Sequence, residues 1–156
     1  MELQVFKIQT MNEITQCAGL LVYRVHNNKI QFLLVHPTNH TKKVYAIPKG
    51  HIELGETKIL SAMRETYEET GVRAKPVIQL PEIRYAVYRD KSIKVVTFFL
   101  AEYESGVDEN GVSHNHDFES DDVRFFDTNS LPAVYNTQQP VIDSALKYIN
   151  NKILNK

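Results

Sequence analysis

The chain lacks several features that common classes of protein require. Its 156 residues include only one cysteine, so no internal disulfide can form and a cysteine-based metal centre is not expected. The formal net charge is only -1, which gives no overall attraction to nucleic acid or to acidic membranes. A polyanionic ligand must therefore be held by local cations or by a metal ion.

Long apolar segments are absent as well. The longest apolar runs, such as Val95 to Ala101, are far shorter than the roughly 20 residues that a membrane-spanning helix needs. Residues 1–16 carry scattered charges at Glu2, Lys7 and Glu13 and lack the apolar stretch of a secretory signal. We therefore expect a cytoplasmic protein that does not associate with a membrane.

The length and composition predict one α+β domain. Hydrophobic residues make up 42% of the chain and charged residues 24%, which is ordinary for a globular domain with its own core. No internal repeat, low-complexity tract or interdomain linker is evident in the sequence. We expect a single domain over residues 17–156, preceded by an N-terminal extension, residues 1–16, that is either an extra strand or a loose tail.

Hydrophobic periodicity and turn residues predict the order of the elements. Asn27 and Asn28 separate two apolar strands, and asparagine suits the positive φ angles of a tight hairpin. Gly71 stands where a glycine commonly ends a helix. Residues 106–122 are polar and acidic and predict a loop. Strands are expected over residues 17–25, 30–36, 44–47, 83–88, 93–103 and 123–126, and helices over residues 57–70 and 140–152.

The helix expected over residues 57–70 has two different faces. On a wheel of about 100° per residue, Glu65, Glu68 and Glu69 share one side. We interpret the opposite, apolar side as the one that packs on the core and thereby aims the carboxylates. That apolar side consists of Ile59, Leu60, Met63 and Tyr67.

The acidic side of this helix predicts a bound cation. Like charges three and four residues apart repel one another, and they also oppose the dipole in the C-terminal half of a helix. Ligands that are all oxygen atoms favour Mg²⁺, with Mn²⁺ as a possible substitute, over zinc or copper. For the helix taken alone, a solvated acidic face is the alternative.

Residues 50–72, GHIELGETKILSAMRETYEETGV, resemble the signature of the Nudix hydrolases, G-x5-E-x7-R-E-U-x-E-E-x-G-U, where U is a bulky aliphatic residue. Only Thr66 departs from it. The resemblance implies a mixed β-sheet sandwiched between α-helices. It also implies hydrolysis of a nucleoside diphosphate linked to another moiety. The matching residues are Gly50, Glu56, Arg64, Glu65, Glu68, Glu69, Gly71 and Val72.

The same resemblance implies roles for individual residues. Glu65, Glu68 and Glu69, with the carbonyl of Lys49, are expected to bind the metal. Glu65 and Glu68 also count among the expected catalytic residues. Arg64 is expected to orient a catalytic carboxylate, and Glu56 is expected to support the cluster.

The residue that takes a proton from the attacking water differs among members of the family. Our candidate here is Glu119, in the acidic segment before the strand expected over residues 123–126. Asp121 and Asp122 are alternates. A solvated acidic loop is the competing interpretation for each of these carboxylates.

The segment YAIPKGH, residues 45–51, and Arg64-Glu65-Thr66 resemble the diadenosine tetraphosphate hydrolase branch of the family. By that resemblance the substrate is a dinucleoside polyphosphate, and Lys49 and His51 lie near it. Lys94, or Lys91 instead, is expected to contact the polyphosphate. An aromatic ring can stack on any base, so one of three tyrosines is expected to do so, with packing in the core or hairpin as the alternative for each. These tyrosines are Tyr45, Tyr85 and Tyr88.

Three further interpretations bear on function. A nucleoside triphosphate pyrophosphohydrolase is an alternative within the same family. A Nudix-fold module that binds nucleotides without catalysis is an alternative of another class, although such modules typically lose glutamates of the signature. The sequence has no basic stripe for a polynucleotide, so none is expected as a partner. Both a monomer and a homodimer are compatible with it.

Overall fold

The computed structural model of the chain describes residues 13–38, 43–114 and 119–152. Two α-helices and two short 3-10 helices accompany the strands. Of the helices in these described ranges, none is long and apolar enough to cross a membrane. The elements are β1 (Glu13–His26), β2 (Lys29–Pro37), β3 (Lys49–His51), α2 (Lys58–Thr70), β4 (Arg73–Gln79), β5 (Ile83–Val87), β6 (Ser92–Ser105), β7 (Ser120–Asp127), η1 (Thr128–Ser130), η2 (Asn136–Gln138) and α3 (Gln139–Lys152).

The strands form one mixed, 7-stranded sheet. Its main path runs β4-β6-β1-β2-β7, while β3 pairs with β1 and β5 pairs with β6. β1 and β6 run parallel, and the other pairs are antiparallel. The predicted hairpin between β1 and β2 is confirmed, because Asn27 and Asn28 both have positive φ angles, of 50° and 61°.

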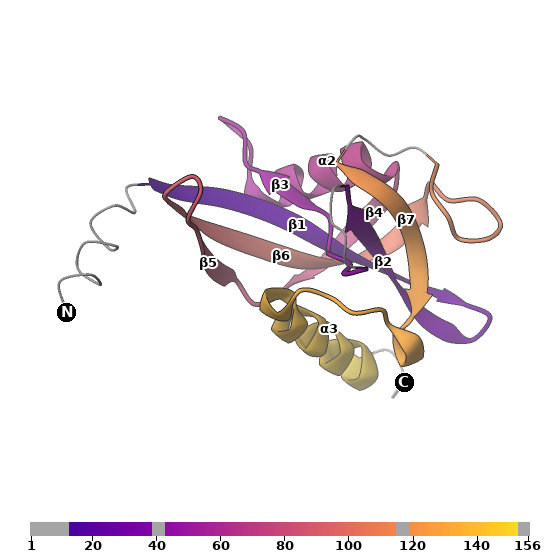
Figure 1. Cartoon of the computed structure of the whole chain (residues 1–156). Coiled ribbons are helices and arrows are strands. Elements are labelled where there is room, and N and C mark those ends of the chain that lie inside the picture. The colour runs from indigo at the N-terminus through magenta and orange to yellow at the C-terminus, as the bar shows by residue number, and fades with distance from the viewer. Residues whose placement is uncertain (1–12, 39–42, 115–118, 153–156) are drawn as a thin grey trace.

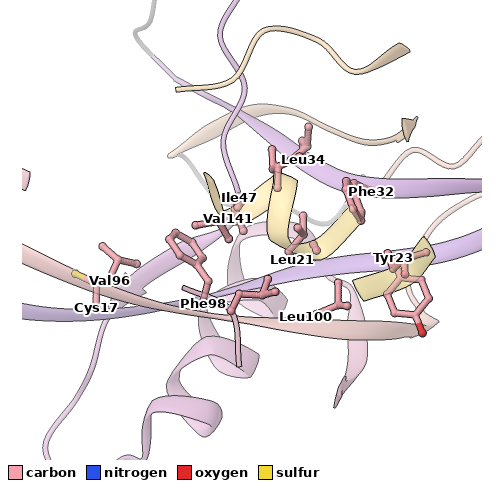
Figure 2. Packing of buried hydrophobic residues seen from close by; sticks show 14 residues of the cluster. Cys17, Leu21, Tyr23, Phe32, Leu34, Ile47, Val96, Phe98, Leu100 and Val141 are labelled. Atoms are coloured by element: carbon pink, nitrogen blue, oxygen red, sulfur yellow. The ribbon is translucent and has the colours of Figure 1, made fainter. Parts of the chain in front are cut away.

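The sheet lies between α2 on one face and α3 on the other (Figure 1). Successive side chains of β1 point to opposite faces, so Leu20 contributes to the core under α2 and Leu21 to the core under α3. Figure 2 shows Leu21, Phe98 and Val141 of the second core gathered between the sheet and α3. This arrangement confirms the predicted α+β class, with a mixed sheet between helices.

Several boundaries differ from those predicted. β1 begins at Glu13, so residues 13–16 continue the first strand and pair with β6. Residues 1–12 of the expected extension lie outside the described residues, and the division of the chain at residue 17 stays a prediction. The strand expected over residues 44–47 is reduced to isolated bridges, such as that between Val35 and Ala46.

Strand β4 was not predicted from the sequence, and it contains a proline. Pro76 has no backbone N–H to donate, which argues against a strand in the interior of a sheet. β4 lies at the end of the strand order and pairs only with β6, and its register shifts at this proline. An edge strand tolerates proline, since one of its sides makes no ladder bonds.

The prediction of which face of α2 packs on the core was wrong. Leu60 is 56% exposed, and Ile59, Met63 and Tyr67 are also exposed. The buried side chains are instead Ser61, Ala62, Thr66, Glu69 and Thr70. Small residues allow the helix to lie close to the sheet, whose own large side chains fill the core beneath it. Because Glu69 belongs to this buried face, the acidic residues lie at the boundary between helix and sheet.

We expect Ala62→Leu to lower the free energy of unfolding by about 1–3 kcal/mol, because it adds a branched side chain where the helix meets the sheet. Leu60→Ser, on the exposed side, should change it by no more than about 0.5 kcal/mol. Urea denaturation of both variants measures the difference. A larger loss for Leu60→Ser than for Ala62→Leu would contradict the orientation of α2 described above.

Candidate active site

Helix α2 is fixed at both ends. Thr57 is its N-terminal cap, and the Thr57 hydroxyl oxygen accepts a hydrogen bond from the Leu60 amide at 3.2 Å. At the other end, Gly71 adopts a left-handed conformation with φ of 70°, and its amide donates to the Tyr67 carbonyl. The predicted role of Gly71 as a helix cap is thereby confirmed. The side chains between these caps project from a helix with defined ends.

Arg64 is the centre of the polar cluster on α2. Its Nε and Nη2 atoms donate to the two carboxylate oxygens of Glu56, at 2.7 and 2.8 Å. Nη1 donates to Glu65 at 2.9 Å and to Glu68 at 3.1 Å, and Nη2 also donates to the His51 carbonyl at 3.0 Å. A planar guanidinium thus gathers carboxylates from the helix and from the loop before it.

The same contacts set the charge states of the cluster. The hydrogen bonds from Arg64 lower the pKa of Glu56 to about 2, so this carboxylate is ionised at neutral pH. Burial raises the pKa of Glu65, although its bond with Arg64 acts in the opposite direction. One guanidinium faces several carboxylates, so the cluster keeps an excess of negative charge that a cation can neutralise.

Glu65 and Glu69 both reach strand β3. A Cβ atom added to Gly50 would lie 2.0 Å from Cδ of Glu65, so only glycine leaves room for this carboxylate. One residue earlier, the Lys49 amide donates to Oε2 of Glu69 at 3.2 Å. Both carboxylates therefore flank the Lys49–Gly50 peptide, as the predicted metal site requires.

The donor atoms around this peptide suit a hard divalent ion. They are carboxylate and carbonyl oxygens, and the Glu69 side chain is held nearly buried, at 6% exposure. Within the described ranges, however, no three His, Cys, Asp or Glu side chains are grouped closely enough to form a finished ligand shell. Two of these side chains, Glu65 and Glu68, accept hydrogen bonds from Nη1 of Arg64.

Two adjoining cavities open beside the cluster. The smaller, of about 370 Å³, is lined by Cys17, Lys49, Gly50, His51, Glu65, Lys94 and Glu119. The larger, of about 510 Å³, has an apolar wall formed by Val35, Pro37, Ala46 and Ile47. Tyr85, Tyr135 and Gln138 also line the larger cavity. Lys49 and Glu119 line both cavities, which therefore meet at these two side chains.

A family model for the NUDIX domain matches residues 15–145. The chain belongs to the NUDIX domain family. Among curated relatives, the bis(5'-nucleosyl)-tetraphosphatase [asymmetrical] of Rattus norvegicus is 35% identical over 97 residues, which are 56% of this chain and 64% of that protein. The match thus spans under two thirds of that relative. The protein of the same name from Caenorhabditis elegans is 30% identical over 108 residues, 66% of this chain and 75% of that protein.

Solved structures share the fold. A Caenorhabditis elegans Ap4A hydrolase in a binary complex superposes with a TM-score of 0.67 at 20% identity, covering 91% of this chain and 99% of that one. The NUDIX domain of Shewanella oneidensis NrtR, complexed with ADP ribose, gives a TM-score of 0.68 at 18% identity, covering 88% of this chain and 90% of that one. At these identities the likeness concerns the Nudix fold.

The three acidic candidates for the general base occupy different places. Glu119 lines both cavities, opposite the Nudix helix residue Glu65 in the smaller one. Asp121 instead pairs with His36, with 2.5 Å between Oδ1 and Nδ1. Asp122 accepts a hydrogen bond from the Tyr45 hydroxyl at 2.5 Å, and its Oδ1 atom lies 3.0 Å from Nη2 of Arg124. Of these carboxylates, Glu119 alone lines either of the two cavities described above.

The three tyrosines that were candidates for stacking on a base also occupy different places. Tyr85 lines the larger cavity, and its register partner across the β5–β6 hairpin is Lys94, which lines the smaller one. Tyr45 packs edge-on against Phe126, and burial together with its bond to Asp122 raises its pKa to about 12. Tyr88 is 70% exposed. Neither Tyr45 nor Tyr88 lines a cavity among the described residues.

Three of the predicted cationic side chains line the cavities beside the cluster. Lys94 and His51 line the smaller cavity, and Lys49 lines both, with its Nζ atom 5.9 Å from the centre of the Tyr85 ring. Burial lowers the pKa of Lys49, but Tyr85 and Glu69 outweigh that effect and the pKa lies above its usual value. Lys91, the alternative to Lys94, is exposed at the hairpin turn.

Sequence reasoning missed Tyr135 and Gln138. Both belong to the segment between β7 and α3, far along the chain from the Nudix signature, and reach the cavity only through the fold. The backbone bridge between Tyr45 and Val134 brings this segment alongside residues 45–47. No spacing or composition in the sequence marks that contact.

We predict that Gly50→Ala displaces the Glu65 carboxylate, since the added methyl group would overlap it. Mg²⁺ affinity measured by calorimetry should fall, while the urea midpoint changes less than in Ala62→Leu. Leu54→Ala is the matched control for the loop, because the Leu54 side chain is fully exposed. Unchanged Mg²⁺ affinity in Gly50→Ala would show that the position of Glu65 is irrelevant to metal binding.

Proposed function

We propose that this protein is a Nudix hydrolase that uses Mg²⁺, or Mn²⁺ in its place, to cleave a phosphoanhydride bond in a dinucleoside polyphosphate such as diadenosine tetraphosphate. One observation carries the proposal. An apolar cavity with aromatic walls and a charged cavity with two lysines and two glutamates meet at Lys49 and Glu119. A nucleotide has the same two-part chemistry, with a flat base joined to a chain of phosphates.

The carboxylates beside these two cavities fit the metal that this chemistry needs. Glu65, Glu68, Glu69 and the Lys49 carbonyl would hold it, because oxygen atoms are the ligands that Mg²⁺ prefers. When bound, such an ion neutralises charge on the phosphate oxygens and lowers the pKa of a bound water. The protein residues supply the remaining functions.

Arg64 keeps Glu65 in place through the bond at 2.9 Å. Lys49 and Lys94 add positive charge beside the phosphate chain, which loose phosphoryl-transfer transition states require. Glu119, exposed and at the junction of the cavities, accepts the proton of the attacking water. This assignment follows from its position, because Glu119 lines the smaller cavity together with Glu65.

Two observations support a dinucleoside polyphosphate over other substrates. Tyr85 and Lys94 face one another across β5 and β6, so an aromatic face for a base adjoins a cation for a phosphate. The rat and nematode relatives are bis(5'-nucleosyl)-tetraphosphatases by name. Cytoplasmic location and a monomeric or dimeric state remain part of the proposal.

The test is hydrolysis of a panel of dinucleoside polyphosphates and nucleoside triphosphates with Mg²⁺, with products identified by mass. Diadenosine tetraphosphate should give the highest kcat/KM, and EDTA should abolish turnover. Glu68→Gln and Glu69→Gln should each lower kcat by orders of magnitude, because each removes a metal ligand.

Glu104→Gln, on the exposed part of β6, is the control and should retain activity. Retention of most activity in both Glu68→Gln and Glu69→Gln would reject the metal assignment. Hydrolysis confined to nucleoside triphosphates would identify a pyrophosphohydrolase of those substrates instead. Nucleotide binding without any turnover would indicate a non-catalytic module.

A further inference from the structure

Gln138 is a buried polar side chain in the wall of the larger cavity. It ends η2, immediately before α3, and is 2% exposed. Its Oε1 atom accepts a hydrogen bond from the Ile47 amide at 2.8 Å. Ile47 precedes Pro48, where regular strand pairing is interrupted, so Gln138 satisfies a backbone donor that has no ladder partner there.

This hydrogen bond determines which end of the Gln138 side-chain amide remains available for another partner. The Ile47 N–H group can only donate, so it must face the carbonyl oxygen of Gln138 and not the NH₂ group. The Nε2 atom, with its two hydrogens, is therefore the end that remains. Among the described residues no hydrogen bond from Nε2 is found, and Nε2 is not one of the fully buried atoms that lack a partner, so it is open to the cavity.

An amide donor that is open to a cavity can be completed by a ligand that enters it. Gln138 lines the cavity together with the apolar wall of Val35, Ala46 and Ile47. In an apolar pocket, a single well-placed polar group decides how a ligand is oriented. The Nε2 donor is thus positioned to meet an acceptor on whatever occupies the cavity.

The rest of the wall indicates what that ligand is. Tyr85 and Tyr135 offer aromatic faces, and the cavity, of about 510 Å³, has room for a bicyclic ring. Purines carry ring nitrogens that accept hydrogen bonds in the plane of the ring, and their faces stack on aromatic side chains. Stacking alone does not distinguish one base from another, whereas a fixed donor does.

We propose that Gln138 determines base specificity by donating a hydrogen bond from Nε2 to a ring nitrogen of a purine. The proposal rests on the proposed function in one respect, namely that the ligand is a nucleotide. Gln138 is a binding residue in this account, and it takes no part in the hydrolysis of the phosphoanhydride.

The test uses adenosine, which is uncharged and requires neither metal nor turnover. Adenosine and its 1-deaza, 3-deaza and 7-deaza analogues are titrated into the full-length protein, and binding is followed by NMR. One analogue should bind about threefold to tenfold more weakly than adenosine, which is the effect of losing one hydrogen bond. The side-chain amide signal of Gln138 should shift with adenosine and with the two other analogues only.

A variant then links the lost bond to Gln138. In Gln138→Met the difference between adenosine and the weak analogue should disappear, because no donor remains. Gln139→Met is the matched control. The Gln139 Nε2 atom donates to Asp143 at 2.9 Å on the exposed side of α3, so the difference should persist there.

Equal binding of all the analogues to the unmodified protein would overturn the proposal, as would a difference that persists in Gln138→Met. If that variant does not fold, the analogue series and the Gln138 amide signal decide the question on the unmodified protein. Failure of adenosine to bind at all would also overturn it. The hydrolysis panel would still decide the proposed function separately, since it does not depend on this titration.

Discussion

The hydrogen bonds of the Arg64 guanidinium are the interaction on which the rest of the site depends. They join Glu56 in the loop, Glu65 and Glu68 on the helix and the His51 carbonyl at the end of β3. Without this cation, carboxylates one turn apart on a helix would repel one another. With it, they form one connected cluster, whose remaining negative charge matches a divalent ion. The bonds to Glu56 and His51 also tie the loop before α2 to the helix.

The packing of α2 on the sheet also determines where these carboxylates lie. Helix α2 lies on the sheet through small side chains, Ser61, Ala62 and Thr66, so its acidic residues come close to β3. Gly50 then leaves room for the Glu65 carboxylate. The same Lys49–Gly50 segment continues into the cavity that holds Tyr85 and Gln138. The proposed metal site and the proposed base pocket therefore share one strand, and a shift in β3 would disturb both.

The parts of this account that were predictable from sequence are those encoded locally. The spacing of Glu56, Arg64 and Glu65 and the cap at Gly71 depend on residues within one loop and one helix. The orientation of α2 was not predictable from its own sequence, because the large apolar residues that fill the core beneath it come from β1, β2 and β6. A helical wheel ranks the faces of a helix by hydrophobicity alone. It does not include the sheet, against which only small side chains allow close packing here.

Long-range contacts account for the other misses. Tyr45 was an attractive stacking candidate by sequence, yet Asp122 and Phe126, on β7, hold its hydroxyl and ring. Tyr135 and Gln138 enter the cavity only because their segment bridges to residues 45–47. Glu119, the first candidate from the sequence, lines the smaller cavity, whereas its alternate Asp121 on β7 pairs with His36. These relations are properties of strand pairing, which no local pattern records.

The central claim is that the carboxylates gathered around Arg64 hold a divalent cation. The most direct measurement is the NMR of side-chain carboxyl carbons in glutamate-labelled protein titrated with Mn²⁺, whose unpaired electrons broaden nearby signals. The account predicts saturable binding, with the signals of Glu65 and Glu69 broadened first and that of Glu104 unaffected. Weak, unsaturable broadening spread evenly over the surface glutamates would contradict it.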